Sequence, residues 1–143
     1  MKLTIALFAA VFLTASAYAQ SAGIITIASG GTNNVAVSAT NTYTAFAVSD
    51  FDNVGVQVTL KGTGAATSTV QLEAYKSLDS TSYETTPSTS QLITLNGTTA
   101  VTTVLNIATP SAGTMKLVLG NTNASVAVTN VAIVRRVKAP KRN

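Results

Sequence analysis

The chain has 143 residues, of which 46% are hydrophobic and only 10% are charged. This length suits one ordinary domain, and the apolar content supports a packed core, so two domains and a disordered chain are both excluded. Five acidic residues are too few to give several helices a solvated face, whereas Thr, Ser and Val abound. The composition therefore predicts an all-β protein.

The first 19 residues have the three regions of a secretory signal peptide. Lys2 supplies the positive region, residues 3–13 are apolar, and Ala17-Tyr18-Ala19 has the small-x-small pattern that signal peptidase accepts. An uncleaved anchor is the alternative, but the apolar run is shorter than the ~20 residues that span a bilayer. We expect a mature chain that begins at Gln20 and is secreted, periplasmic or displayed at the cell surface, or that belongs to a virion if a phage encodes it.

Apolar and polar residues alternate with a period of two along the mature chain, which predicts strands with one buried face. In chain order, the expected strands cover residues 23–28, 43–48, 54–60, 70–74, 91–95, 101–107, 115–119 and 125–137. In the last of them the apolar parity shifts near Thr129-Asn130. This shift predicts a β-bulge there, or a strand that is covered on both faces.

Turn-forming residues separate these runs at intervals of roughly 8–12 residues, which is typical of a sandwich or a barrel. Asn96-Gly97, between Leu95 and Val101, is a hairpin signal. We predict a single antiparallel β-sandwich, jelly-roll or immunoglobulin-like, over residues 20–137. A basic tail follows at residues 138–143.

The chain has no His and no Cys, which excludes a Ser-His triad, a cysteine nucleophile and an ordinary zinc site. Asp50-Phe51-Asp52-Asn53 is the densest group of oxygen ligands, but it lacks the later glycine and glutamate of an EF-hand loop. We interpret it as a turn with Phe51 tucked inward. We expect no enzymatic activity, no catalytic residue, no metal site and no cofactor.

Charge is unevenly placed along the chain. Three lysines and five acids lie between Gln20 and Val134, a net charge of −2, whereas the last nine residues are strongly basic. The basic residues expected to contact a partner are Arg135, Arg136, Lys138, Lys141 and Arg142. Such a segment can reach a neighbouring copy, a larger assembly or an anionic surface, or it can simply solubilise the end of a strand. No specific recognition of nucleic acid is expected.

The segment from Ser77 to Tyr83 is predicted to be a hairpin loop, in which Asp79 accepts hydrogen bonds from downstream backbone N–H groups and Tyr83 folds back over the turn. Together with Gly62-Thr63-Gly64 and Val70, this segment resembles a pattern in β-sandwich domains of tailed-phage virion proteins. Those domains often have Gly where this chain has Ser80, and Trp where it has Tyr83. The resemblance covers residues 54–83 and implies a sandwich fold with a structural or attachment role.

Two functions of different classes are consistent with these observations. The first is a non-catalytic structural or surface-display protein, either a virion decoration or tail component or an exported envelope protein. The alternative is a carbohydrate-binding or adhesion module that uses Tyr75, Asp79 and Tyr83 to hold a polysaccharide. Sugar-binding sites commonly offer flat aromatic rings, and this chain has no Trp and only four Tyr, which favours the structural protein.

Overall fold

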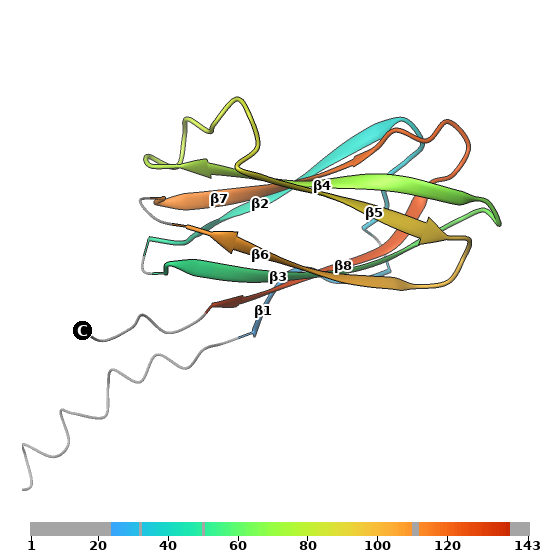
Figure 1. Cartoon of the computed structure of the whole chain (residues 1–143), viewed down its shortest axis with the longest axis horizontal. Coiled ribbons are helices and arrows are strands. Elements are labelled where there is room, and N and C mark those ends of the chain that lie inside the picture. Colours follow the sequence, from blue (N-terminus) through green and yellow to red (C-terminus); the bar gives the residue numbers. More distant parts are fainter. Residues whose placement is uncertain (1–23, 32, 50, 110–111, 138–143) are drawn as a thin grey trace, which may run out of the picture.

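In the part of the chain that the computed structural model describes, eight strands form two four-stranded antiparallel sheets that pack face to face (Figure 1). The structure describes residues 24–31, 33–49, 51–109 and 112–137. The expected signal peptide and the tail at residues 138–143 lie outside these residues. The strands are β1 (Ile24–Ala28), β2 (Ala39–Ala47), β3 (Asn53–Gly62), β4 (Thr67–Ser77), β5 (Thr89–Asn96), β6 (Val101–Ala108), β7 (Thr114–Asn121) and β8 (Val128–Val137).

The strand order is that of a jelly roll. One sheet, called sheet A here, has the order β1-β8-β3-β6, and the other, sheet B, has the order β2-β7-β4-β5. The first strand pairs with the last, the second with the seventh, the third with the sixth and the fourth with the fifth. This is one long antiparallel ribbon wrapped into two layers, so of the two predicted kinds of sandwich the jelly roll is the one observed.

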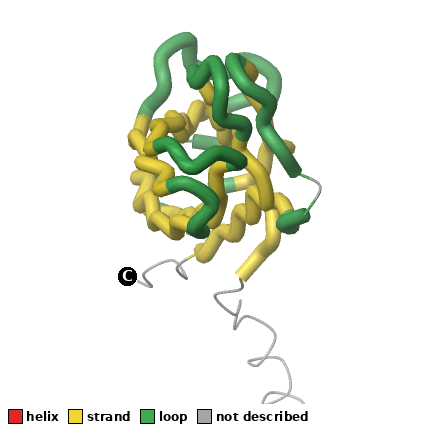
Figure 2. The backbone as a smooth tube through the Cα atoms, turned by 90° about the vertical axis from the view of Figure 1, so that its right-hand side faces the viewer, coloured by secondary structure: helices red, strands yellow, loops and turns green. Residues whose placement is uncertain are grey.

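The prediction of a hairpin at Asn96-Gly97 is wrong. Among the described strands, β4 and β5 are the only consecutive pair that share a sheet. β5 belongs to sheet B and β6 to sheet A, so the turn at Asn96-Gly97 is an arch between the layers. Figure 2 views the sandwich from this end, where green loops join the yellow strands. Gly97 has the positive φ of 59° that the Asn-Gly pair predicts, but its carbonyl accepts the N–H of Gly62 at 3.2 Å. The dipeptide specifies the local turn and not the partner of the strand that follows.

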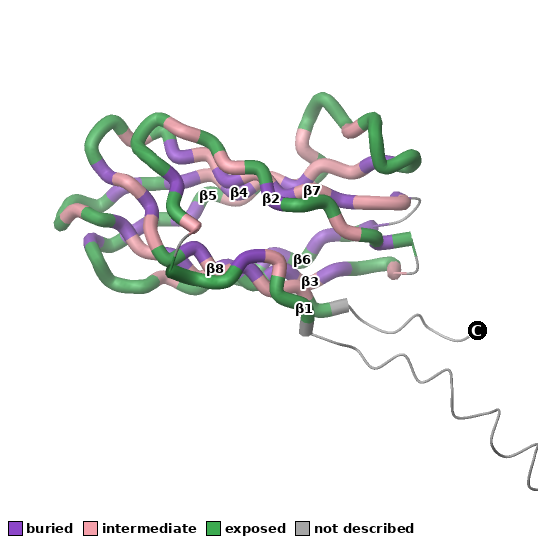
Figure 3. The backbone as a smooth tube through the Cα atoms, turned by 180° about the vertical axis from the view of Figure 1, so that it is seen from behind, coloured by how far each residue is buried: buried purple, intermediate pink, exposed green. Residues whose placement is uncertain are grey.

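The core consists of the inward-facing residue of each alternating pair. In Figure 3 the buried residues recur as purple segments along the strands of both layers. The clear alternations in the sequence are confirmed: β3, β4 and β7 bury every second side chain. Fully buried large residues are Leu60, Leu72, Leu95, Ile107, Met115, Leu117, Leu119, Ile133, Val35, Val48, Val54 and Val56.

Within the described residues, no helix has the length and hydropathy that a membrane crossing needs.

The predicted β-bulge in the last strand is confirmed. Thr129 pairs with Lys61 and Ala132 with Thr59, so Asn130 and Val131 lie opposite the single residue Leu60. The additional residue allows Val131 to face the core, as Val128 does, although the two are three positions apart. Asn130 is exposed and has a φ of 53°, a left-handed conformation that Asn tolerates better than most residues.

We predict that Asn130→Val lowers the free energy of unfolding by about 1–2 kcal/mol, because a β-branched residue is strained at positive φ. Urea denaturation of the purified domain measures this difference. Asn53→Val, at an exposed position that begins β3, is the matched control and is expected to change stability by less than about 0.5 kcal/mol. Equal stability of the two variants would contradict the role given to the bulge.

Candidate functional site

The tyrosines divide into one in the core and two at the surface among the described residues. Tyr43 is 8% exposed and packs in the core, where burial raises the pKa of its hydroxyl to about 12. Tyr75 lies on the outer face of sheet B, and Tyr83 lies in the loop between β4 and β5. Both of these side chains are partly exposed, so a ligand can reach their aromatic rings.

The register between β4 and β7 brings the two surface tyrosines to one lysine. Tyr75 pairs directly with Lys116, and both side chains point away from the core because their strand neighbours Ala74, Met115 and Leu117 are buried. The Lys116 Nζ lies 4.4 Å from the centre of the Tyr83 ring and 5.4 Å from that of Tyr75. These are cation–π distances. We call Tyr75, Tyr83 and Lys116 the tyrosine–lysine platform.

A row of polar side chains continues from the platform across sheet B. The Tyr75 hydroxyl donates to Glu73 Oε2 at 2.7 Å, and Gln71 Nε2 donates to Glu73 Oε1 at 3.0 Å. Gln71 Nε2 also donates to Ser90 Oγ at 2.9 Å on the neighbouring strand β5. The hydrogen bond to the Glu73 carboxylate raises the pKa of Tyr75. The row therefore fixes the Tyr75 side chain and keeps its hydroxyl protonated.

The loop between β4 and β5 is organised by Asp79, as the sequence predicts. Asp79 Oδ1 accepts the N–H of Thr81 at 2.9 Å, the N–H of Ser82 at 2.7 Å and the hydroxyl of Ser77 at 2.9 Å. These three donors hold the pKa of the Asp79 carboxyl well below its ordinary value, although the side chain is exposed. Ser80, where the virion pattern has Gly, has a φ of 66°, a conformation that glycine adopts without strain.

Backbone hydrogen bonds hold the base of this loop against the sandwich. The Glu84 N–H donates to the Lys76 carbonyl at 3.0 Å, and the Lys76 N–H donates to Glu84 Oε2 at 3.2 Å. From the other side, the Gly113 N–H donates to the Ser77 carbonyl at 2.8 Å. A Cβ at Gly113 would lie 2.6 Å from the Leu78 carbonyl oxygen, so this close approach requires glycine.

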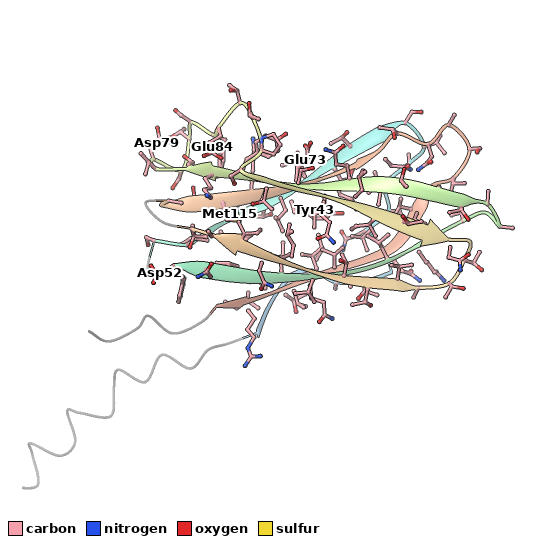
Figure 4. The ribbon with its side chains drawn as sticks, in the orientation of Figure 1. Tyr43, Asp52, Glu73, Asp79, Glu84 and Met115 are labelled. Atoms are coloured by element: carbon pink, nitrogen blue, oxygen red, sulfur yellow. The ribbon has the colours of Figure 1, made fainter. Side chains whose placement is uncertain are left out.

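An open pocket of about 620 Å³ lies at this end of the sandwich. The Asp79 and Glu84 side chains lie on the loop at one end of sheet B, and Glu73 lies further along the same sheet (Figure 4). The pocket and the platform share the Tyr83 ring, whose hydroxyl is 3.4 Å from Thr114 Oγ1. The lining residues are Lys76, Ser77, Leu78, Asp79, Ser82, Tyr83, Glu84 and Ala112.

Of the three residues predicted for sugar binding, Tyr75 and Tyr83 meet at Lys116, and Asp79 lines the pocket together with Tyr83. Lys116 and Glu73 were not among the site residues predicted from the sequence. Both occupy polar positions of an alternating strand, and this was the only sequence signal for them. Lys116 cannot be linked to Tyr83 before the pairing of β4 with β7 is known, whereas Glu73 lies two residues before Tyr75 on the same face of β4.

The basic residues expected to contact a partner do not share one environment. Arg135 is part of β8 and is partly buried: its Nη1 donates to the Ala47 carbonyl at 2.8 Å, and its guanidinium carbon lies 4.6 Å from the centre of the Phe46 ring. Burial lowers the pKa of Arg135. It joins sheet A to sheet B, whereas Arg136 is exposed. The remaining predicted contacts, Lys138, Lys141 and Arg142, lie outside the described residues.

The Phe51 side chain is partly buried and packs against the core, as expected for the turn before β3. The Thr109 N–H donates to the Asp52 carbonyl at 2.8 Å, so this turn is held by backbone hydrogen bonding. Asp50 lies outside the described residues. Among the side chains that the structure does describe, no group of three or more His, Cys, Asp or Glu residues could hold a metal ion.

Comparison with known proteins identifies the architecture and no closer relationship. No protein-family model matches the sequence, and no curated protein matches it. One similar solved structure is the CBM36-1 domain of a multidomain xylanase from the hindgut metagenome of Trinervitermes trinervoides. Its TM-score is 0.52 at 9% identity, and the match covers 82% of this chain and 98% of that domain. Tripeptidyl peptidase 2 gives 0.54 at 9% identity, over 84% of this chain but only 10% of the peptidase chain. At these identities the similarity shows the β-sandwich fold alone.

We predict that the Asp79 carboxyl titrates below its ordinary pKa of 3.8. Because the folded state binds this proton more weakly than the unfolded state, the stabilisation of the loop is present above pH 3.8 and is lost as the pH falls towards the depressed folded pKa. Nuclear magnetic resonance of the Thr81 and Ser82 amide protons between pH 6 and pH 0.5 follows the titration. Asp79→Asn is expected to remove it, and a midpoint at or above 3.8 would contradict the assignment.

Proposed function

We propose that this protein is a non-catalytic carbohydrate-binding module and that the tyrosine–lysine platform, with the adjoining pocket, holds a polysaccharide. The single observation that carries this proposal is that Lys116 lies over the rings of both Tyr75 and Tyr83. The two tyrosines come from a strand and from a loop, and they meet on the solvent side of sheet B.

The chemistry of the surface matches that of a sugar. A pyranose ring offers apolar C–H faces and several hydroxyl groups, so it is recognised by exposed aromatic rings combined with a few fixed hydrogen-bonding groups. Tyr75 and Tyr83 supply partly exposed rings. The carboxylates of Asp79 and Glu84 supply acceptors at one end of sheet B, and Glu73 supplies another further along the sheet. A neutral, hydroxyl-rich ligand satisfies this mixture without requiring a compensating charge.

Much of the surface is already fixed by contacts within the protein. Glu73 is bonded to both Tyr75 and Gln71, and Asp79 is bonded to its own loop. Lys116 lies over both rings and limits their movement. Such preorganisation reduces the side-chain entropy lost on binding, which is a large part of the free-energy cost of forming a complex.

The fold is compatible with this proposal but does not decide it. One of the similar solved structures described above is a carbohydrate-binding domain of a xylanase. Jelly rolls, however, serve both viral capsids and lectins, so function has to be argued from the surface. A virion or envelope role stays a prediction from the sequence, and the platform gives the sugar-binding role the better support.

The proposal is tested by titrating soluble xylan, mixed-linkage β-glucan and their oligosaccharides into the purified protein, with isothermal calorimetry and affinity electrophoresis as readouts. Tyr83→Ala is expected to weaken binding about tenfold, because lost stacking of about 1.4 kcal/mol corresponds to that factor. The double variant Tyr75→Ala/Tyr83→Ala is expected to abolish it.

Two lysines provide a matched control. Lys116→Ala is expected to weaken binding because it frees the two rings, whereas Lys61→Ala, on the opposite sheet, is expected to leave affinity unchanged. Absence of binding to every polysaccharide in the panel would contradict the proposal. Equal affinity of the wild type and the tyrosine variants would place the binding surface elsewhere.

A further inference from the structure

Each of the two sheets has two edge strands, and the four edge strands lie in two pairs with different properties. β1 and β2 form one open side of the sandwich, and β5 and β6 form the other. An edge strand presents unpaired N–H and C=O groups to solvent and is a template for another strand unless it is short, bulged, charged or interrupted by proline.

The side formed by β1 and β2 has several of these protections. β1 has only five residues, and its register is broken between Thr26 and Ala28. β2 has a register break between Tyr43 and Phe46. Arg135 also lies across this side, with its guanidinium over Phe46 and bonded to Ala47. A regular ladder with another chain would be interrupted on both sheets.

The side formed by β5 and β6 has none of these protections against pairing with another strand. Each strand has eight residues, and each pairs with its inner neighbour in an unbroken register. The stretch from Thr89 to Ala108 contains no charged residue and no proline. It also exposes two large apolar side chains on the outer faces of the sheets, Leu92 at 67% and Val104 at 55%.

We propose that this side is an interface with a second copy of the chain, in which β6 pairs antiparallel with β6 of the other copy around Val104. A two-fold axis at Val104 places it opposite its own copy and Thr102 opposite Asn106, all on the outer face. Neutral side chains then face neutral side chains, so no charge is desolvated. A partner strand that carried charge would lose its hydration at this edge without gaining a counter-charge.

The size of this side predicts a reversible dimer. Eight residues of antiparallel strand extend about 27 Å, and two sheets about 10 Å apart with their outer side chains give a width of about 20 Å. The contact is then about 500 Å² per copy, or about 1,000 Å² in total. That total is at the low end of specific interfaces, where weak and transient association is usual.

The arrangement also has a consequence for the platform. A two-fold axis perpendicular to the sheets continues each sheet into its own copy, so the outer faces of both copies of sheet B point the same way. The two platforms of a dimer could then bind one extended polysaccharide. Once the first platform has bound, the effective concentration of the polysaccharide at the second platform is raised. The dimer itself does not depend on sugar binding.

Sedimentation velocity of the full chain from 1 μM to 1 mM tests the interface. The wild type is expected to shift from monomer to dimer with concentration, and Val104→Lys is expected to weaken the dimer at least tenfold. Asn106→Lys, on the same outer row of β6, provides a second variant if the first fails to fold, as judged by circular dichroism. Thr42→Lys, an exposed residue on the β2 edge, is the matched control and should leave the dimer intact.

Salt separates this interface from association through the basic end of the chain. A neutral edge should pair equally well at 50 mM and 500 mM salt, whereas contacts of the basic residues are screened. A wild type that stays monomeric at 1 mM would overturn the proposal. So would a dimer that dissociates with salt, a dimer that Val104→Lys and Asn106→Lys leave unchanged, or one that Thr42→Lys weakens equally.

Discussion

The pairing of Tyr75 with Lys116 is the constraint on which the site depends. Leu72 and Ala74 fix which face of β4 is buried, and Leu117 and Leu119 do the same for β7. A slip of one residue would turn a whole strand over and place a charged or polar side chain in the core, so the register is strongly specified. The outward positions of both strands follow, and with them the shared location of Tyr75 and Lys116.

The loop adds the second aromatic ring without relying on the core. Asp79 satisfies the N–H groups of Thr81 and Ser82, and Gly113 allows the neighbouring segment to approach Leu78 closely. The loop is therefore a built structure, although most of its residues are exposed. Its geometry comes from charge-assisted hydrogen bonds to one carboxylate, which are stronger than neutral ones and do not require burial.

Local physics predicted local structure well. Alternation located β3, β4 and β7, a parity shift located the bulge at Asn130, and turn chemistry predicted the role of Asp79. β2 begins at Ala39 rather than Tyr43, because half-buried Ala39 and Asn41 give no clear apolar period. What the sequence could not provide was the choice of sheet for each strand. Three features depend on that choice: the arch at Asn96-Gly97, the approach of Lys116 to Tyr83, and the hydrogen bond from Arg135 to the Ala47 carbonyl.

In the wrapped ribbon, the sequence separation between paired residues increases from the β4–β5 hairpin to the β1–β8 pair. Near the β4–β5 loop the pairs are local, such as Ala74 with Thr89, whereas at the other extreme Ile24 pairs with Arg136. Closing a long loop has a larger entropic cost than closing a short one, so folding should begin at this hairpin and proceed outward along the ribbon. Tyr75, Asp79 and Tyr83 thus lie in the part of the chain that can form earliest, and β7 has to arrive before Lys116 joins them. The surface on which the proposed function depends would be complete before the outermost strands close the sandwich.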